Sequence, residues 1–340
     1  MALANRESQL GTLLVYLPCY LDYELSLRQA KKIREIFKES KLRPNFSIKT
    51  MISINGLNLT SEQLREVKAL TDYQVIFPFG ISGDINITQG FMHAIRLKAD
   101  YLWILSSNDA VASTFVEAFQ RHLLEKPEAD LLVGCTSNNL GVRKVASVFD
   151  PENQEIPFGL ISAVIYRTAR TSNNFDSAVQ LNWTGWGQLA TIEASCISRN
   201  GLTVSVIEEK TLYTRSIRGL DDSKKESERI RNGYAHSFFG MPILINSLLA
   251  GDPKRQNRLL NEWVRSNWYL VNYFLNTDFK LWNAHLASNQ SWLRAYANAA
   301  IGNASPRYRI LFLASKRLNL ARFQNWAVAK WLRARLQKRV

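Results

Sequence analysis

Short apolar runs alternate with helical patterns along the first 210 residues of the chain. The apolar runs have the length of buried strands. They lie at residues 13–17, 46–54, 73–77, 101–105, 130–133, 158–166 and 202–207. Apolar residues recur on one helical face at residues 23–39, 61–70, 86–97, 113–124 and 186–199. Strands that alternate with helices of this length predict an α/β fold, with a mostly parallel central sheet and helices on both of its faces.

The pattern changes after residue 213. Residues 214–233 are strongly polar, which is typical of a loop or a linker, and a helical, tryptophan-rich segment follows them. The sequence therefore predicts three parts: a core at 1–213, a polar loop or linker at 214–236, and a helical, basic C-terminal region at 237–340.

Positive charge is concentrated in the last part of the chain. The whole sequence carries a formal net charge of +14, and residues 251–340 hold 16 Lys and Arg against 3 acids. Residues 306–340 contain ten basic residues and no acidic one. An anionic partner is therefore expected to meet the C-terminal end.

Cysteine usage and hydropathy bear on the compartment. Three scattered cysteines, Cys19, Cys135 and Cys196, have no metal-ligand spacing and suit a reducing cytoplasm. The N-terminus has no apolar signal core, and no apolar stretch is long enough to cross a bilayer. We therefore expect a cytoplasmic protein that is soluble or peripheral to a membrane.

The first candidate for chemistry is Asp109. The apolar run at 101–105 leads into Ser106-Ser107-Asn108-Asp109, and ligands of parallel sheets bind beyond the carboxyl ends of the strands. A carboxylate there could hold Mg²⁺ or Mn²⁺, which would neutralise the charge that develops on a diphosphate leaving group. The alternative is that Asp109 caps the helix that begins near Val111 or Ser113.

Two longer segments resemble a known family. Residues 80–94 (GISGDINITQGFMHA) and 99–109 (ADYLWILSSND) resemble the nucleotide-binding core of GT-A glycosyltransferases, closest to the family-two-like group that builds bacterial O-antigen and capsule. In that family a Gly/Asn-rich segment opens a helix, and an aromatic-rich strand then runs into a D-x-D-type motif. Here the motif reads Ser107-Asn108-Asp109, so its first acid is missing and Asp109 matches the metal-binding position.

The resemblance implies a site for a nucleoside-diphosphate sugar donor. Residues 17–20 (LPCY) are similar to the family's first-strand segment, whose loop lies against the nucleotide. Residues 52–56 (ISING) are similar to the second-strand end that meets the base or ribose. A strand-ending turn is the other interpretation of both segments, because Pro, Asn and Gly are common turn residues. The implied donor-binding residues are Pro18, Tyr20, Asn55, Gly83, Asn86, Ser107 and Asn108.

Residues 182–188 (NWTGWGQ) resemble the family's G-W-G segment, which begins a helix beside the acceptor. Tryptophan faces stack on the apolar faces of sugar rings. Trp183, Trp186 and Gln188 are therefore the candidates for acceptor binding. The alternative is a pair of core aromatics at the entry to a helix.

In inverting members of the family an E-D pair follows this segment, and its Asp is the general base. Here Gln188-Leu189 stands in that position, so the nearby acids Glu193 and Asp176 are the catalytic candidates and the stereochemistry stays open. His236 lies where many GT-A enzymes have a late metal-binding histidine, although a lone histidine beside apolar residues is commonly structural.

Residues 306–340 mix Arg and Lys with Trp, Phe and Leu, a composition that anchors peripheral helices to anionic membranes. Nucleic-acid binding would use the same charge, and a solvated helical subdomain packed on the core is a third interpretation. We favour the membrane surface because polymerising transferases meet lipid-linked acceptors there, and we expect no nucleic-acid partner.

Together these features predict a metal-assisted glycosyltransferase at the inner face of the cell membrane. It would move a sugar from a nucleoside-diphosphate sugar to a saccharide or a lipid-linked saccharide in surface-polysaccharide synthesis. The departures from the family pattern at its charged positions leave one alternative from another class. This is a non-catalytic protein of the same fold that binds a saccharide or an anionic surface.

Overall fold

A computed structural model describes residues 11–20, 23–43, 45–78, 81, 83–106, 109–136, 140–215 and 240–263. The chain forms two compact units, Met1–Gly219 and Leu220–Val340. Most of the predicted linker at 214–236, His236 and the basic region at 306–340 lie outside the described residues.

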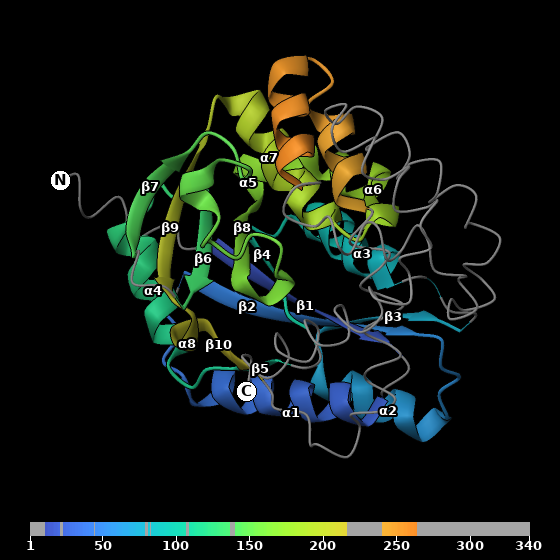
Figure 1. Cartoon of the computed structure of the whole chain (residues 1–340). Coiled ribbons are helices and arrows are strands. Elements are labelled where there is room, and N and C mark those ends of the chain that lie inside the picture. The colour runs from blue at the N-terminus through green and yellow to red at the C-terminus, as the bar shows by residue number, and fades with distance from the viewer. Residues whose placement is uncertain are drawn as a thin grey trace, which may run out of the picture. The chain divides into compact units, whose positions relative to one another are not determined.

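The first unit is built on an eight-stranded sheet with the order β3-β2-β1-β4-β8-β6-β9-β7 (Figure 1). Its strands are β1 (Gly11–Tyr20), β2 (Phe46–Asn55), β3 (Tyr73–Phe77), β4 (Tyr101–Ile104), β6 (Leu131–Cys135), β7 (Gly141–Val145), β8 (Val164–Arg167) and β9 (Leu202–Glu208). Strands β1 to β4 are parallel to one another, and so are β6 and β9. Strands β8 and β7 run antiparallel to their neighbours. The prediction of an α/β fold with a mostly parallel sheet is confirmed.

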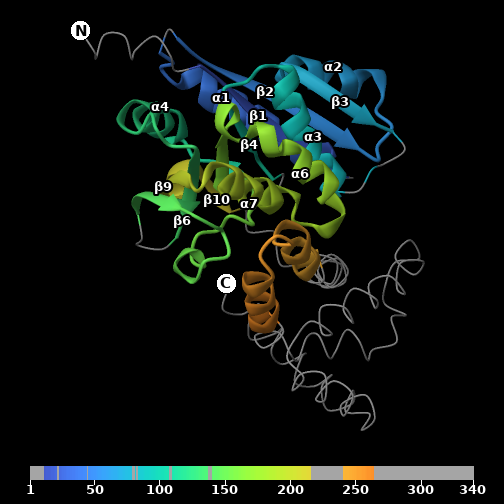
Figure 2. The same ribbon diagram turned by 90° about the horizontal axis from the view of Figure 1, so that it is seen from above.

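Helices cover both faces of this sheet (Figure 1). Helices α1 (Tyr23–Glu39) and α2 (Ser61–Leu70) pack together against β1, β2 and β3 on one face. On the other face α3 (Gly83–Arg96), α6 (Phe175–Gln180) and α7 (Gly187–Arg199) contact one another (Figure 2). Further helices are α4 (Phe115–Glu125), α5 (Thr168–Thr171) and α8 (Glu209–Leu212).

Burial on both faces explains the apolar runs of the central strands. Leu13, Leu14 and Val15 in β1 are fully buried, which is typical of a parallel strand covered by helices on each side. Trp103 in β4 is also fully buried and stacks on Phe115 of α4, with ring centroids 4.5 Å apart. The hydrophobic core therefore follows β1 and β4 through the middle of the sheet.

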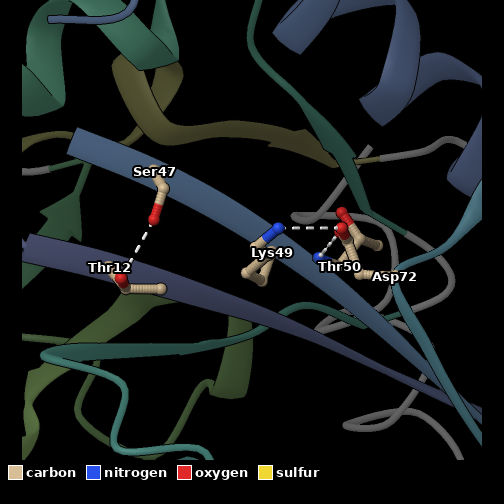
Figure 3. Close-up of polar contacts among 5 residues, drawn as sticks. All are labelled: Thr12, Ser47, Lys49, Thr50 and Asp72. Carbon is tan, nitrogen blue, oxygen red and sulfur yellow. Dashed lines mark hydrogen bonds and ion pairs between the residues drawn. The ribbon is translucent and has the colours of Figure 1, made fainter. Parts of the chain in front are cut away.

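Polar contacts fix the amino ends of the strands, as Figure 3 shows. The hydroxyls of Thr12 in β1 and Ser47 in β2 lie 2.9 Å apart. The carboxylate of Asp72, just before β3, accepts hydrogen bonds from the backbone N–H of Thr50 at 2.8 Å and from Lys49 Nζ at 3.3 Å. These contacts hold the strand register, and the register aligns the opposite, carboxyl ends of the strands.

The segment before β8 differs from the prediction. We expected one strand at 158–166, but β8 begins only at Val164, and Ile161–Ala163 form a 3-10 helix. The backbone before β8 bonds to side chains rather than to a neighbouring strand. The carbonyl of Gly159 accepts from Gln188 Nε2, and the carbonyl of Ser162 accepts from Trp103 Nε1, both at 2.9 Å.

The first unit also contains a small two-stranded antiparallel sheet that the sequence pattern did not predict. Its strands are β5 (Asp109–Val111) and β10 (Tyr213–Arg215). Strand β5 contacts α1. The predicted site residue Asp109 therefore begins a strand, and the helix that it was considered to cap, α4, begins only at Phe115.

The described residues of the second unit are helical at 240–248 and 253–263. Leu244 and Leu260 are fully buried, one in each helix. Asp252 accepts the backbone N–H of Arg255 at 3.1 Å, so it caps the second helix. The predicted helical character holds for these residues, and the rest of 237–340 lies outside the described part of the chain.

Candidate active site at the carboxyl edge of the sheet

The carboxyl ends of three strands lie in one row. In the register of the sheet Tyr20 pairs with Asn55, and Asn55 pairs with Phe77. Strand β4 pairs with β1 only as far as Ile104, which lies opposite Tyr16. The segment that leads to Asp109 therefore leaves the sheet beside the last residues of β1, among them the predicted Pro18 and Tyr20.

Asn55 anchors the loop between β3 and α3. Its Nδ2 donates to the carbonyl of Ile81, and its Oδ1 accepts the backbone N–H of Ile81, both at 2.6 Å. The side chain is 0 % exposed. Asn55 thus pairs with the backbone as a strand residue would, and both ends of its amide are used in holding Ile81.

Asn86 joins the start of α3 to two strands. Its Oδ1 accepts from Ser53 Oγ at 2.5 Å and from Tyr16 Oη at 3.1 Å, and its Nδ2 donates to the carbonyl of Cys19 at 3.2 Å. Burial raises the pKa of Tyr16 well above its ordinary value, so the phenol keeps its proton and can donate it. Because Asn86 is 1 % exposed and both ends of its amide are bonded, its geometry favours fixing the helix start over direct contact with a ligand.

The segment between β4 and β5 is held from two sides. From α1, Gln29 Nε2 donates to the carbonyls of Ser106 at 2.8 Å and of Asp109 at 2.5 Å. From the 3-10 helix before β8, Ser162 Oγ accepts the backbone N–H of Ser106 at 2.9 Å. The backbone N–H of Asp109 also donates to the carbonyl of Ser106, at 3.0 Å. The backbone that carries Asp109 is therefore fixed at both ends.

The fit of this segment to a divalent cation rests on Asp109. Its side chain is partly exposed, at the carboxyl edge of the sheet. Within the described residues, no three or more His, Cys, Asp or Glu side chains are grouped as they would be to hold a metal ion. Asp109 can thus supply one carboxylate ligand. Ser107 and Asn108, predicted to bind the donor, lie outside the described residues.

The G-W-G segment packs tightly between helices. A Cβ atom on Gly187 would lie 2.9 Å from the carbonyl oxygen of Ala178 and 3.1 Å from Thr88 Cγ2. Glycine therefore allows the first turn of α7 to approach α6 and α3. Close packing of the helices is therefore sufficient to explain a glycine at position 187.

Trp186 and Gln188 both contact Gly159. A Cβ atom on Gly159 would lie 2.7 Å from Trp186 Cζ3, so the indole ring lies against this glycine. Trp186 remains partly exposed, whereas Gln188 is buried and uses its Nε2 to hold the Gly159 carbonyl. Trp186 thus keeps surface that could face an acceptor, and Gln188 has a structural contact. The side chain of Trp183 does not belong to the part of the chain that the structure describes.

The two acids considered for catalysis lie in different environments. Glu193 in α7 is 0 % exposed and accepts from Ser147 Oγ at 2.8 Å and from the backbone N–H of Val148 at 2.9 Å. Asp176 is exposed in the first turn of α6, where it accepts the backbone N–H of Ser177 at 2.9 Å. The geometry favours a structural role for Glu193, which holds the loop after β7.

Sequence reasoning missed Gln29 and Ser162. A signal for Gln29 existed, because it lies on the buried face of α1 beside Ser26, Ala30 and Ile33. A polar residue on such a face needs a partner, which here is the segment that carries Asp109. Ser162 had no comparable signal, because its hydroxyl acts across 56 positions of the chain.

No protein-family model and no curated protein sequence matches this chain. Solved structures do match it. S. aureus TarS 1–349 in complex with UDP-GlcNAc is similar over 92% of this chain and 88% of that one, with a TM-score of 0.54 and 14% identity. A longer S. aureus TarS structure has the same TM-score at 12% identity, and this chain spans about half of its length (54%).

A mannosyltransferase from Pyrobaculum calidifontis in complex with GDP-Man and Mn²⁺ is similar over 96% of this chain and 87% of that one, with 13% identity and a TM-score of 0.46. The TarS matches show a shared fold. This chain therefore has the fold of the GT-A glycosyltransferases, as the resemblance of residues 80–109 implied. None of the described helices is long and apolar enough to span a membrane.

Proposed function

We propose that this protein transfers a sugar from a nucleoside-diphosphate sugar to a saccharide or lipid-linked saccharide acceptor in surface-polysaccharide synthesis. The observation that carries the proposal is the position of Asp109. Its segment leaves β4 at the carboxyl edge of the sheet, beside the ends of β1 and β2, in a chain with the GT-A fold. Ligands of open α/β sheets bind at this edge.

The donor would lie against Pro18, Tyr20, Gly83, Ser107 and Asn108. Asn55 and Asn86 would contribute by holding the backbone around it, because their amide groups are already bonded to Ile81 and to β1 and β2. A UDP-sugar is the first donor to test, since the solved complexes of S. aureus TarS contain UDP-GlcNAc and UDP.

A divalent cation, Mg²⁺ or Mn²⁺, would be bound by the carboxylate of Asp109, and His236 is a second candidate ligand. Such a cation neutralises the diphosphate leaving group when it is bound. One or two protein carboxylates suffice in sites where substrate phosphates and water supply the remaining ligands. A single Asp109 is compatible with that arrangement.

The acceptor would lie beside the G-W-G segment. The partly exposed side chain of Trp186 supports this, because an accessible aromatic face can stack on a sugar ring. Trp183 is the second stacking candidate, and Gln188 would support the site through its bond to Gly159. Asp176, which is exposed in α6, would act as the base.

Donor hydrolysis tests the proposal directly. We expect the protein to hydrolyse one of a panel of nucleoside-diphosphate sugars, beginning with UDP-GlcNAc, and to do so faster with Mn²⁺. Asp109→Asn should abolish hydrolysis and keep the melting temperature, because a partly exposed carboxylate contributes little to the core. Asp72→Asn is the matched control at the opposite edge of the sheet, where Asn can still accept the bond from Thr50.

Two results would contradict the proposal. One is hydrolysis in Asp109→Asn at the wild-type rate. The other is no hydrolysis of any donor by the wild type. Saccharide binding without hydrolysis would favour the non-catalytic alternative.

We also propose that residues 306–340 bind an anionic membrane surface at the inner face of the cell membrane. Ten basic residues without an acid support this. Each basic residue near an anionic leaflet contributes about 1 kcal/mol of attraction. A truncation that ends at Ser305 should lose co-sedimentation with anionic liposomes and keep donor hydrolysis. A gel shift with nucleic acid at the same ionic strength, without liposome binding, would overturn the membrane interpretation.

A further inference from the structure

Gln29 stands out because it is a polar side chain on the buried face of a helix and contacts the candidate site. It is 7 % exposed, and its Nε2 bonds to the carbonyls of both Ser106 and Asp109. One carbonyl lies just after β4, and the other belongs to the residue that carries the candidate carboxylate. A shift of Gln29 would therefore move the carboxylate.

The orientation of the Gln29 amide is fixed by chemistry. Turned the other way, Oε1 would face two carbonyl oxygens, and acceptor would meet acceptor. In the observed orientation, Oε1 is buried and has no hydrogen-bond partner among the residues that the structure describes. Leaving an acceptor buried and unpaired costs about 1 to 3 kcal/mol. The two bonds from Nε2 must offset this cost, and both of them hold the backbone at Ser106 and Asp109.

Ser162 holds the backbone of Ser106 from the other side. Its Oγ accepts the N–H of Ser106, and its own carbonyl is held by Nε1 of the fully buried Trp103. The backbone of Ser106 is thus bonded both to α1 and to the segment before β8. Both supports act on backbone atoms, at Ser106 and at Asp109, and so fix the position from which the Asp109 side chain extends.

We propose that Gln29 and Ser162 are positioning residues that hold Asp109 in place for a divalent cation bound with a nucleoside diphosphate. This inference rests on the proposed function. Residues that orient a metal ligand affect metal affinity even though they do not touch the metal, and their loss typically weakens it about 10- to 100-fold.

The chain contains a matched control for Gln29. Gln120 in α4 is also buried, and it also braces backbone: its Nε2 donates to the carbonyl of Lys41 at 3.1 Å, and its Oε1 accepts the N–H of Arg43 at 2.8 Å. These contacts fix the loop before β2, at the amino edge of the sheet. Gln29→Met and Gln120→Met each remove two hydrogen bonds to backbone and keep a side chain of similar length.

The experiment is calorimetric titration of Mn²⁺ with UDP into the full-length wild type, Gln29→Met, Ser162→Ala and Gln120→Met, beside the melting temperature of each. We expect the two Met variants to lose similar stability. We expect the dissociation constant for Mn²⁺ with UDP to rise about tenfold or more in Gln29→Met and by a smaller factor in Ser162→Ala. It should stay within about twofold of wild type in Gln120→Met.

The outcomes separate this inference from the proposed function. If the wild type binds neither Mn²⁺ with UDP nor Mn²⁺ with GDP or CDP, the proposed function fails, and the positioning role fails with it. If the wild type binds and Gln29→Met and Ser162→Ala bind equally well, only the positioning role is overturned. If Gln29→Met does not fold, the test rests on Ser162→Ala, which should fold because the loss of one hydroxyl leaves only a small cavity. An unchanged dissociation constant for Mn²⁺ with UDP in Ser162→Ala would then overturn the inference.

Discussion

Asp130 and Thr203 exchange two hydrogen bonds at the amino ends of β6 and β9. The backbone N–H of Asp130 donates to the carbonyl of Thr203 at 2.8 Å, and the N–H of Thr203 donates to Asp130 Oδ2 at 2.8 Å. The carboxylate thus supplies the acceptor that another residue of β6 would otherwise provide. The pair satisfies a strand N–H and fixes the register where the strand begins.

The same relationship occurs twice more in the sheet. Asp72 exchanges bonds of 2.9 and 2.8 Å with Thr50, and Asp100 exchanges bonds of 2.9 and 2.7 Å with Thr12. In all three pairs the aspartate directly precedes a strand, which is β3, β4 or β6. The pairs lie at the amino edge of the sheet, opposite the candidate active site, so they belong to the fold rather than to the chemistry.

Removing the carboxylate of Asp130 should destabilise the protein without changing its site. Asp130 is buried, so Asp130→Ala leaves the N–H of Thr203 unpaired and should cost about 1 to 3 kcal/mol in the free energy of unfolding. Asp130→Asn keeps an acceptor and should cost less. Asp72→Ala should also cost less, because Asp72 is exposed and water can replace it. Urea unfolding measures all three, and equal losses would contradict this explanation.

The hydrophobic pattern predicted most of the sheet because the central strands are buried on both faces. The runs at 46–54, 73–77 and 202–207 agree with β2, β3 and β9 to within one residue. A strand that is buried on both faces consists of consecutive apolar residues, so a short stretch of sequence is enough to identify it. Strand β7 was missed because four of its five residues are exposed or partly exposed and it has no apolar run.

The candidate site was predictable only where a motif marks it. The segment from β4 to Asp109 was found because an acid follows a buried aromatic strand. The contacts that hold this segment join residues 77 and 56 positions apart, Gln29 with Ser106 and Ser106 with Ser162. A single sequence does not record which buried glutamine or serine reaches which backbone atom. For Asn55, Asn86 and Gln188 the sequence likewise shows a side-chain amide, but not the backbone atoms to which that amide is hydrogen-bonded.

His122 should make the protein sensitive to mild acid. It is buried in α4, and burial lowers its pKa from 6.5 to about 4, with Lys126 lowering it further and Glu128 opposing. Between these two pKa values the unfolded chain binds the proton and the folded chain does not, so stability falls as the pH falls. The loss from pH 8 to pH 5 should be about 2 kcal/mol for this residue.

The measurement is urea unfolding of wild type and His122→Gln at both pH values. The variant should lose less stability than the wild type over this range, because the other titrating groups are common to both. His93→Gln is the control. Burial also lowers the pKa of His93, but this side chain is partly exposed, so His93→Gln should differ less from the wild type in the stability lost between pH 8 and pH 5. An identical pH dependence of wild type and His122→Gln would refute the assignment.

Trp186 offers a test of the acceptor site. If its ring stacks on the acceptor sugar, Trp186→Ala should raise the acceptor KM by about 2- to 10-fold and leave the donor KM nearly unchanged. Gly159→Ala is a second test of the acceptor site, because it disturbs the Trp186 ring without removing it. The new methyl group would lie 2.7 Å from the ring, so the ring must shift while the aromatic residue is retained. Equal changes in both KM values, or loss of the fold, would favour the alternative that Trp186 is a core aromatic.

Glu193 and Asp176 compete for the role of general base, and the structure separates them by exposure. Glu193 accepts bonds from Ser147 and Val148, and Ser147 in turn accepts the N–H of Phe149 at 3.1 Å. The carboxylate is therefore the centre of a buried network that shapes the loop after β7. Asp176 has one bond to its own helix and is open to solvent.

Conservative variants of the two acids should therefore behave in opposite ways. Glu193→Gln puts an amide nitrogen among hydrogen-bond donors, so we expect a loss of about 1 to 3 kcal/mol in unfolding free energy and little change in kcat. Asp176→Asn should keep its stability, because its side chain is exposed. If Asp176 is the base, transfer should fall about 10²- to 10⁴-fold in that variant. Unfolding and single-turnover transfer are measured on both proteins. A large fall in transfer by Glu193→Gln at unchanged stability would restore the catalytic role that its place after the G-W-G segment suggested. A stable Asp176→Asn with full transfer would exclude Asp176 as the base.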